Sequence, residues 1–215
     1  MNNLQAIFFD FDGVIADSVH IKTEAFEKLY KPYGDNIVDL VRKHHIENGG
    51  VSRYEKIRYY HENYLKNRIN ETEINSLADI YSTFVCNAVI DSPFIPGVID
   101  LLNKIYQKIE LFVISATPHD EINRIVEKKG IKKYFKLVCG SPKKKATWID
   151  YILKSYNISN KRSLFIGDMM ADYLAAKNSS VRFIARVDDK EKNIFLDKNV
   201  DEFIIDFYEL DKKLF

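Results

Sequence analysis

The sequence predicts an α/β fold: a parallel sheet with helices on both faces, and a helical insert after the first strand. Six short apolar runs are typical of strands, at residues 4–9, 111–115, 136–139, 163–166, 181–185 and 202–205. Helical spacing of apolar residues separates the later runs, roughly over 97–108, 119–129, 145–156 and 170–178. Strands that alternate with helices are typical of parallel sheets covered on both faces.

The first apolar run, Leu4 to Phe9, leads directly into Asp10, Asp12 and Gly13. A near-continuous apolar run suits a strand buried on both faces. Because successive strand residues point to opposite faces, Asp10 and Asp12 would leave the strand on the same side. Two carboxylates so close repel unless a cation lies between them or one takes a proton. The pair therefore indicates a functional site, with an Asp-Gly turn as the simpler alternative.

The segment from about residue 16 to residue 90 shows no strand-like run, and we expect it to be helical. Helical spacing recurs in three stretches, 23–30, 54–64 and 72–88. Pro93 and Gly97 then mark the return to alternating strands and helices. We therefore expect a core of residues 1–15 and 91–215, and a helical insert of residues 16–90.

The composition argues against several classes of protein. Lysine and arginine number 32 and aspartate and glutamate 31, so no overall positive charge favours a nucleic-acid partner. The two cysteines, Cys86 and Cys139, form neither a disulfide framework nor a zinc spacing. The sequence shows neither a signal sequence nor a long apolar span. Nothing in it therefore indicates a membrane partner. These features favour a soluble protein of the cytoplasm.

Polar side chains follow three of the predicted strands. Asp10, Ser115 and Asp168 each come after an apolar run, and ligands of parallel sheets bind beyond the carboxyl ends of the strands. We therefore expect these groups to converge. An aspartate such as Asp10 can attack phosphorus as a nucleophile, and Asp12 could then act as acid and base. Gly13 allows the tight turn that brings backbone amides to face a phosphate.

Four stretches, in order, resemble the motifs of the haloacid dehalogenase-like hydrolases. D-F-D-G-V at 10–14 resembles the first motif, and Ser115 with Ala116 resembles the second, whose hydroxyl binds a phosphoryl oxygen. G-S-P-K-K-K at 140–145 resembles the third, which supplies a lysine. G-D-M-M-A-D at 167–172 resembles the fourth, which supplies metal ligands. Each motif alone is a modest signal, but four in this order make a strong one.

The resemblance implies a Rossmann-like core with a helical cap, as in the phosphoglycolate phosphatase and β-phosphoglucomutase group. It places Mg²⁺ on the Asp10 carboxylate, the main-chain carbonyl of Asp12, and Asp168. Lys145 is the preferred lysine of the third motif, with Lys144 as the alternative and Lys143 as a solvated charge. Asp172 would bind the ion through water or brace Lys145.

One stretch of the insert resembles the β-phosphoglucomutase cap. In G-V-S-R at 50–53, Arg53 matches an arginine that holds the second phosphate of the mutase's substrate. The alternative is an ordinary surface arginine at the start of a helix. Lys22 stands where the mutase has a histidine that assists its acid/base aspartate, and this departure argues against a mutase.

These observations predict an Mg²⁺-dependent phosphatase acting on a small phosphate ester, a sugar phosphate or a phosphoglycolate-like acid, through an aspartyl-phosphate. One alternative is a β-phosphoglucomutase-like phosphomutase. A second is a non-catalytic module that binds a phosphate ligand, although no charged residue of the four motifs is missing. We expect neither a nucleic-acid nor a membrane partner.

Overall fold

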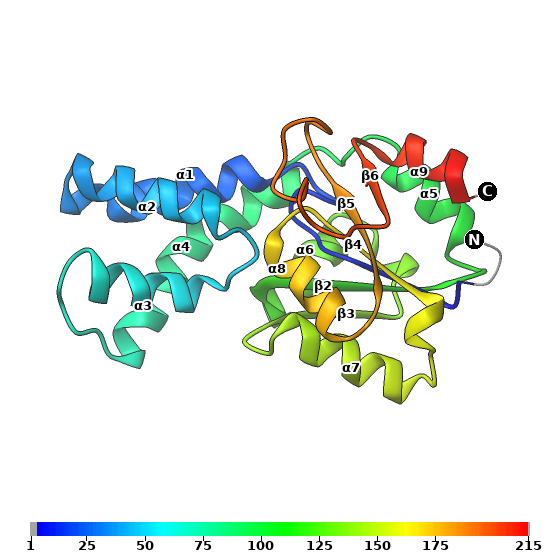
Figure 1. Cartoon of the computed structure of the whole chain (residues 1–215). Helices are drawn as coiled ribbons and strands as arrows, with labels where there is room; N and C mark the ends of the chain where they lie inside the picture. The colour runs from blue at the N-terminus through cyan, green and yellow to red at the C-terminus, as the bar shows by residue number, and fades with distance from the viewer. Residues whose placement is uncertain (1–3, 215) are drawn as a thin grey trace.

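The structure, a computed structural model, describes residues 4–214 and contains a six-stranded parallel sheet with helices on both faces (Figure 1). The first three residues and the last residue of the predicted core lie outside the described residues. The strand order is β3-β2-β1-β4-β5-β6. The strands are β1 (Ala6–Phe9), β2 (Glu110–Pro118), β3 (Leu137–Ser141), β4 (Ser163–Gly167), β5 (Arg182–Arg186) and β6 (Glu202–Ile204). The predicted α/β class and the parallel sheet are confirmed.

Alternate strand residues pack against different helices on the two faces of the sheet. One face packs against α5 (Val98–Ile105), α6 (His119–Lys128) and α9 (Phe207–Leu214), and the other against α7 (Lys145–Ser155) and α8 (Met170–Asn178). On the second face Phe8 stacks on Phe112 and Phe165, with ring centroids 5.4 and 6.4 Å apart. Because both faces are buried, the middle residues of each strand are apolar, and this is the pattern that predicted the strands.

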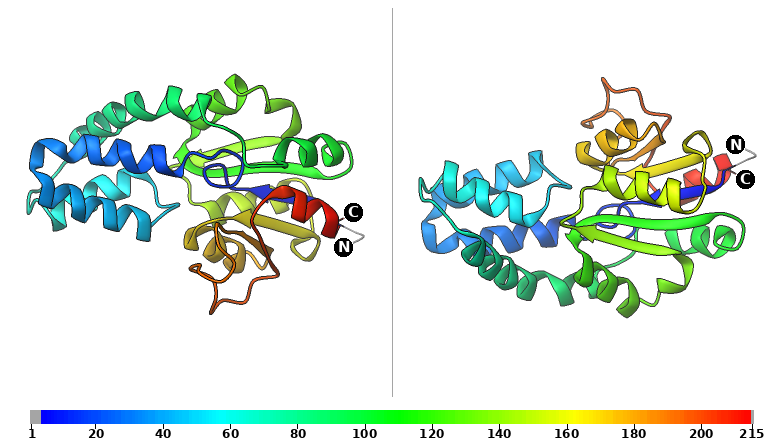
Figure 2. Two further views of the ribbon diagram at one scale, coloured as in Figure 1. Left: turned by 90° about the horizontal axis from the view of Figure 1, so that it is seen from above. Right: turned by 90° about the horizontal axis from the view of Figure 1, so that it is seen from below.

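Four helices between β1 and β2 form an insert that projects from one end of the core (Figures 1 and 2). They are α1 (Val19–Tyr30), α2 (Asp35–Glu47), α3 (Arg53–Asn63) and α4 (Glu71–Asp91). Two chain segments join this insert to the core and lie side by side. The amide of Asp17 donates to the carbonyl of Pro93 (2.9 Å), and the amide of Ile95 donates to that of Ile15 (3.0 Å).

Three elements differ from the sequence prediction, and one of them is α9, which follows the last strand where no helix was predicted. Helix α2 was not predicted, because only Val38, Val41 and His45 of its residues are buried, and a histidine in that stripe hides the apolar period. Strand β2 continues to Pro118, beyond the predicted end at Ser115, and its pairing with β3 shifts register between Ile114 and Pro118.

Among the described residues, no helix combines the length and the apolar character that a membrane span requires. The cytoplasmic location stays a prediction.

Candidate active site

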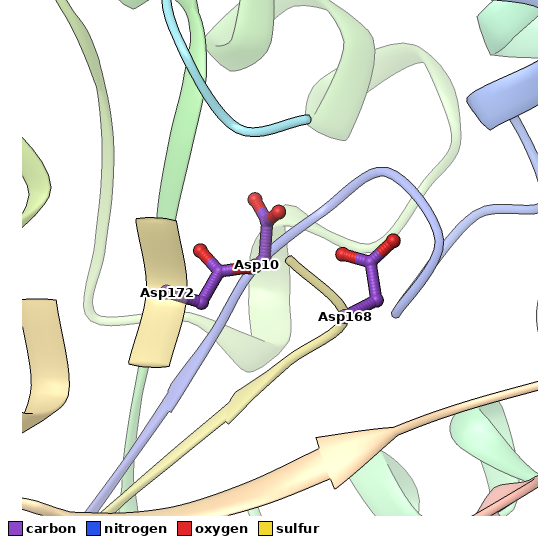
Figure 3. Close-up of side chains that lie close together, drawn as sticks. All are labelled: Asp10, Asp168 and Asp172. Atoms are coloured by element: carbon purple, nitrogen blue, oxygen red, sulfur yellow. The ribbon is translucent and has the colours of Figure 1, made fainter. Parts of the chain in front are cut away.

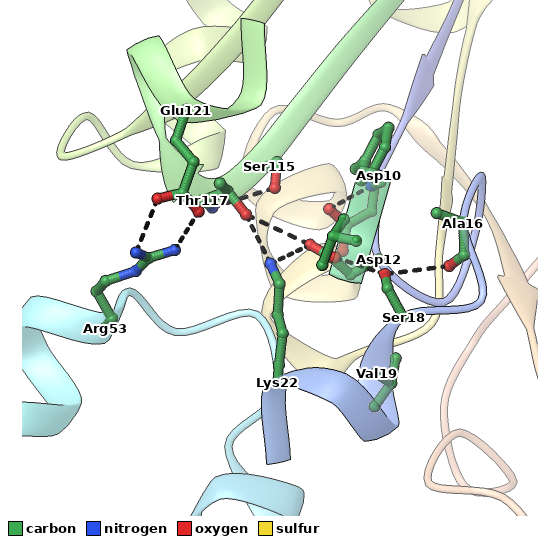
Figure 4. Close-up of polar contacts among 12 residues, drawn as sticks. Asp10, Asp12, Ala16, Ser18, Val19, Lys22, Arg53, Ser115, Thr117 and Glu121 are labelled. Atoms are coloured by element: carbon green, nitrogen blue, oxygen red, sulfur yellow. Dashed lines mark hydrogen bonds and ion pairs between the residues drawn. The ribbon is translucent and has the colours of Figure 1, made fainter. Parts of the chain in front are cut away.

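The pairing of three central strands brings the predicted site residues together. Phe9 of β1 lies opposite Val113 of β2 and Ile166 of β4. All three strands are parallel, so the residues that follow them meet at one edge of the sheet. Asp10 and Ser115 are buried there, and Asp168 follows β4 at the same edge (Figures 3 and 4).

Lys145 is the lysine that reaches the first aspartate. Its Nζ lies 2.9 Å from Asp10 Oδ1 and donates to Asp172 Oδ1 at 2.6 Å. Asp172 Oδ2 also accepts from the amide of Met169 (3.1 Å), which fixes the carboxylate at the start of α8. Burial opposes the charged form of Lys145, but Asp10 and Asp172 outweigh it and raise the Lys145 pKa above its ordinary value. Lys145 therefore remains a permanent positive charge beside Asp10.

Asp12 lies beside Asp10 and is held by side chains of the insert (Figure 4). Ser18 Oγ donates to its Oδ1 (2.6 Å), and Lys22 Nζ donates to its Oδ2. Lys22 also donates to the Thr117 hydroxyl on β2 (2.6 Å), so it joins the insert to the core. Burial raises the Asp12 pKa, but the Lys22 ammonium and the hydrogen bonds from Lys22 and Ser18 lower it below the ordinary value. In this arrangement Asp12 is an ionised carboxylate.

The acidic cluster has the composition of a site for a hard divalent cation. One carboxylate oxygen from each of Asp10, Asp168 and Asp172 lies within 4.8 Å of the others (Figure 3). Asp168 Oδ1 is buried and accepts no hydrogen bond from the described residues, and a cation would satisfy it. Oxygen ligands of this kind suit Mg²⁺. Asp10 and Asp168 thus fit the predicted metal site, while Asp172 braces Lys145.

The raised pKa values of two carboxyl groups in the cluster also favour a bound cation. Burial, together with Asp172 and against Lys145, raises the pKa of Asp10 to about 7. Burial, Asp10 and Asp172 raise the pKa of Asp168 well above its ordinary range. Carboxylates crowded in this way are stable as anions only when a further positive charge joins them. A bound cation would therefore favour the ionised form of Asp10 that a nucleophile requires.

Two of the predicted substrate-binding residues lie at the same edge, and the third has another partner. Ser115 Oγ accepts from the amide of Thr117 (3.1 Å), and Ala116 lines the cavity above Asp10. Arg53, at the start of α3, lines this cavity too. Its guanidinium donates to both oxygens of Glu121, at 2.6 and 2.9 Å (Figure 4). A substrate-binding role for Arg53 stays a prediction.

The cavity between the insert and the core has a volume of about 110 Å³ and is lined by residues from both. Of its other polar residues, sequence reasoning weighed Lys22 and His45 only as weak candidates and did not single out Lys56 or Thr117. Lys56 follows Arg53 by three positions, so the two share one face of α3, and this spacing could have indicated it. Nothing in the sequence indicates that Thr117 contacts Lys22, because that contact joins residues 95 positions apart.

The sequence pattern of the haloacid dehalogenase-like hydrolases matches residues 7–186, which include all four motifs. The chain belongs to this family. A phosphoglycolate phosphatase of Pseudomonas fluorescens is 25% identical over 191 residues, which cover 83% of this chain and 68% of that protein. The family and group expected from the four motifs are thereby confirmed, and the chain is a hydrolase of the haloacid dehalogenase-like family.

Two solved structures show how far the fold of this haloacid dehalogenase-like hydrolase is shared. A candidate β-phosphoglucomutase from Bacteroides vulgatus superposes with a TM-score of 0.80 at 18% identity, over 98% of this chain and 87% of that one. A candidate hydrolase of the same family from Bacillus subtilis, bound to magnesium, superposes with a TM-score of 0.74 at 18% identity, over 99% of both chains. At this identity the likeness supports the fold.

Proposed function

We propose that the protein is an Mg²⁺-dependent phosphatase that hydrolyses a small phosphate ester through an aspartyl-phosphate. The observation that carries this proposal is the buried contact between Lys145 and Asp10 at the carboxyl end of β1, with Asp12 beside it. A carboxylate in this position can attack phosphorus, and a fixed ammonium group offsets the charge that gathers on the phosphoryl oxygens.

Each residue of the site has one task in this reaction. Asp10 attacks phosphorus and holds the phosphoryl group as an acyl-phosphate. Asp12 must first take up a proton, which requires release of its carboxylate from the Lys22 ammonium; it then gives this proton to the departing oxygen and later takes one from the attacking water. The Ser115 hydroxyl and the main chain at Ala116 bind phosphoryl oxygens, and Asp172 holds Lys145 in place. Mg²⁺, held by Asp10, Asp168 and the carbonyl of Asp12, would supply charge neutralisation for phosphate and carboxylates.

We further propose that the helical insert, residues 16–90, acts as a cap on a core of residues 1–15 and 91–215. Support comes from the contacts of Lys22 and Arg53 with Thr117 and Glu121, which enclose the cavity. The paired linkers at 15–17 and 93–95 form a narrow connection about which such a cap can turn. The Bacillus subtilis neighbour is described as showing interdomain movement.

The relatives favour one substrate class. The cavity at Asp10 adjoins a second hollow lined by Ser115 and Lys145, so its own volume sets no limit on the size of the substrate. The curated relatives from Pseudomonas are phosphoglycolate phosphatases, which favours a phosphoglycolate-like acid over a larger sugar phosphate. The phosphomutase alternative depended on Arg53 as the ligand of a second phosphate. Because the Arg53 guanidinium pairs with Glu121, its positive charge is already compensated and is not available to a second phosphate. This contact favours the phosphatase over the mutase.

A phosphate-release assay with and without Mg²⁺ over a panel of small phosphate esters tests the proposal. We expect release only with the metal, and a loss of at least about 10³-fold in the Asp10→Asn variant. Asp150→Asn, an exposed aspartate of α7, is the matched control and should keep full activity. Full activity in Asp10→Asn would rule out the proposed nucleophile.

A further inference from the structure

Three cations from the insert line the cavity, and two of them already have a carboxylate. Lys22 pairs with Asp12, and Arg53 pairs with both oxygens of Glu121. Lys56 is different. Only 2% of it is exposed, and within the described part of the chain no carboxylate lies at ion-pair distance from its Nζ. Lys56 is therefore a buried amine that lines the cavity without a carboxylate partner among the described residues.

The polar partner of Lys56 is a neutral histidine. His45 Nδ1 lies 2.9 Å from Lys56 Nζ and accepts its hydrogen bond, and the His45 carbonyl lies 3.4 Å away. Burial, followed by the charges of Lys56 and Lys22, lowers the His45 pKa to about 2, so the imidazole is uncharged and can accept. When Lys56 is protonated, the Lys56–His45 pair carries one positive charge, and His45 orients the ammonium group.

A charge buried in this way is unfavourable unless an anion accompanies it. Burial and the nearby Lys22 ammonium lower the Lys56 pKa to about 7. Packing alone does not explain the lysine, because its ammonium lies 5.8 Å from the Phe26 ring, near the outer limit of a cation–π contact. An anionic ligand group in the cavity would satisfy Lys56 and relieve its repulsion from Lys22.

We propose that Lys56, oriented by His45, binds a second anionic group of the substrate, a carboxylate or a second phosphate. This inference rests on the proposed phosphatase function, with the reacting phosphoryl group at Asp10 and the second anion at Lys56, which lines the same cavity. The substrate class is then a small phosphate monoester with an anionic group on its leaving portion. Lys56 selects this class without touching the reacting atoms, so its effect belongs to recognition.

The first test compares substrates that differ only in the second group. We expect Lys56→Met to lower kcat/KM for 2-phosphoglycolate by about 10- to 100-fold, the range of a charge-assisted hydrogen bond. Ethyl phosphate, which has no second anion, should change by less than about 3-fold. Lys43→Met, an exposed lysine on α2, is the matched control and should leave both substrates unaffected. Equal losses for the two substrates in Lys56→Met would overturn the proposal.

The second test measures binding without turnover and separates this proposal from the proposed function. In an Asp10→Asn background, calorimetry should show weaker binding of 2-phosphoglycolate after Lys56→Met or Lys56→Gln, with ethyl phosphate unchanged. Unchanged binding of 2-phosphoglycolate and of a small bisphosphate in both variants overturns the role of Lys56, whatever the activity assay shows. Comparing these two ligands assigns the second anion as carboxylate or phosphate, according to which of them loses more affinity.

Discussion

Gly13 lies between the carboxylates of the first motif and the Asp168 carboxylate of the fourth. Its φ of +77° belongs to the left-handed region, which side chains rarely adopt. A Cβ on Gly13 would lie 2.2 Å from Asp168 Oδ2, so the carboxylate can occupy its place only because this position has no side chain. The absence of a Cβ at Gly13 therefore allows the loop after β1 to lie close to the loop after β4.

We expect Gly13→Ala to displace Asp168 and to weaken both Mg²⁺ binding and phosphate release by at least about 10-fold. Gly34→Ala is the control, since its φ is +94° and its Cβ would meet nothing within 4 Å. Both variants should lose roughly 1–2 kcal/mol of folding stability through the backbone. Only Gly13→Ala should lose activity, measured by titrating phosphate release with Mg²⁺. A Gly13→Ala enzyme with normal metal dependence would contradict this interpretation.

The three consecutive lysines of the third motif show what position adds to residue type. Lys145 begins α7 and is buried at Asp10, whereas Lys144 precedes the helix and is exposed. Lys143 packs its ammonium over the Trp148 ring, 3.7 Å from the centroid. Charge alone could not choose among them, and the choice of Lys145 rested on where the helix was expected to begin and on the resemblance to family members with a Gly-Ser-Pro stretch.

Helix α3 places two cations, Arg53 and Lys56, on its buried face, one turn apart. No carboxylate among the described residues pairs with the buried Lys56 amine. Protonation of Lys56 would leave a buried charge without compensation, and it therefore opposes folding. Its pKa of about 7 lies below the ordinary value of 10.5. Between these values the unfolded chain binds a proton that the folded chain does not, and stability therefore rises with pH in this window. Below about pH 7 Lys56 is protonated in the folded and the unfolded chain, so the full free-energy cost of burying its charge is present.

We expect Lys56→Met to be more stable than the unliganded wild type near neutral pH and to lose this advantage as the pH rises. The difference in unfolding free energy should shrink by up to about 1.4 kcal/mol per pH unit between about pH 7 and about pH 10. Urea denaturation of both proteins across this range measures it. Lys43→Met should follow the wild type at every pH. An equal pH dependence in wild type and Lys56→Met would show that Lys56 is not a buried charge.

The strands and the insert differ in how much the sequence reveals. The core strands have apolar middle residues, and polar residues follow three of these apolar runs, so the sheet, most of its helices and the convergence of Asp10, Ser115 and Asp168 were predictable, whereas α9 was not. The insert buries narrower faces, and α2 escaped prediction because His45 occupies part of its stripe. The contacts of Lys22 with Thr117 and of Arg53 with Glu121 join distant residues, which no local period reveals.

At the scale of the whole molecule, the Arg53–Glu121 pair ties the insert to the core. The two side chains are only 4% and 11% exposed, and both terminal guanidinium nitrogens, Nη1 and Nη2, donate to the carboxylate. Ser82 on α4 donates to the same carboxylate at 2.7 Å. Removing one partner of a buried ion pair leaves the other charge without compensation, at about 3–5 kcal/mol. Because this pair joins two parts linked by a narrow connection, the protein can avoid that penalty by opening.

We therefore expect Glu121→Gln to open the insert away from the core, so that Arg53 reaches water. Small-angle X-ray scattering should give a larger radius of gyration, and the linkers near residues 15–17 and 93–95 should be cleaved faster by protease. Glu27→Gln, which breaks the exposed pair with Arg42 inside the insert, should change neither. The double variant Arg53→Met, Glu121→Met should close again, because apolar partners carry no buried charge. A Glu121→Gln protein that stays closed would show that packing, and not this ion pair, holds the two parts together.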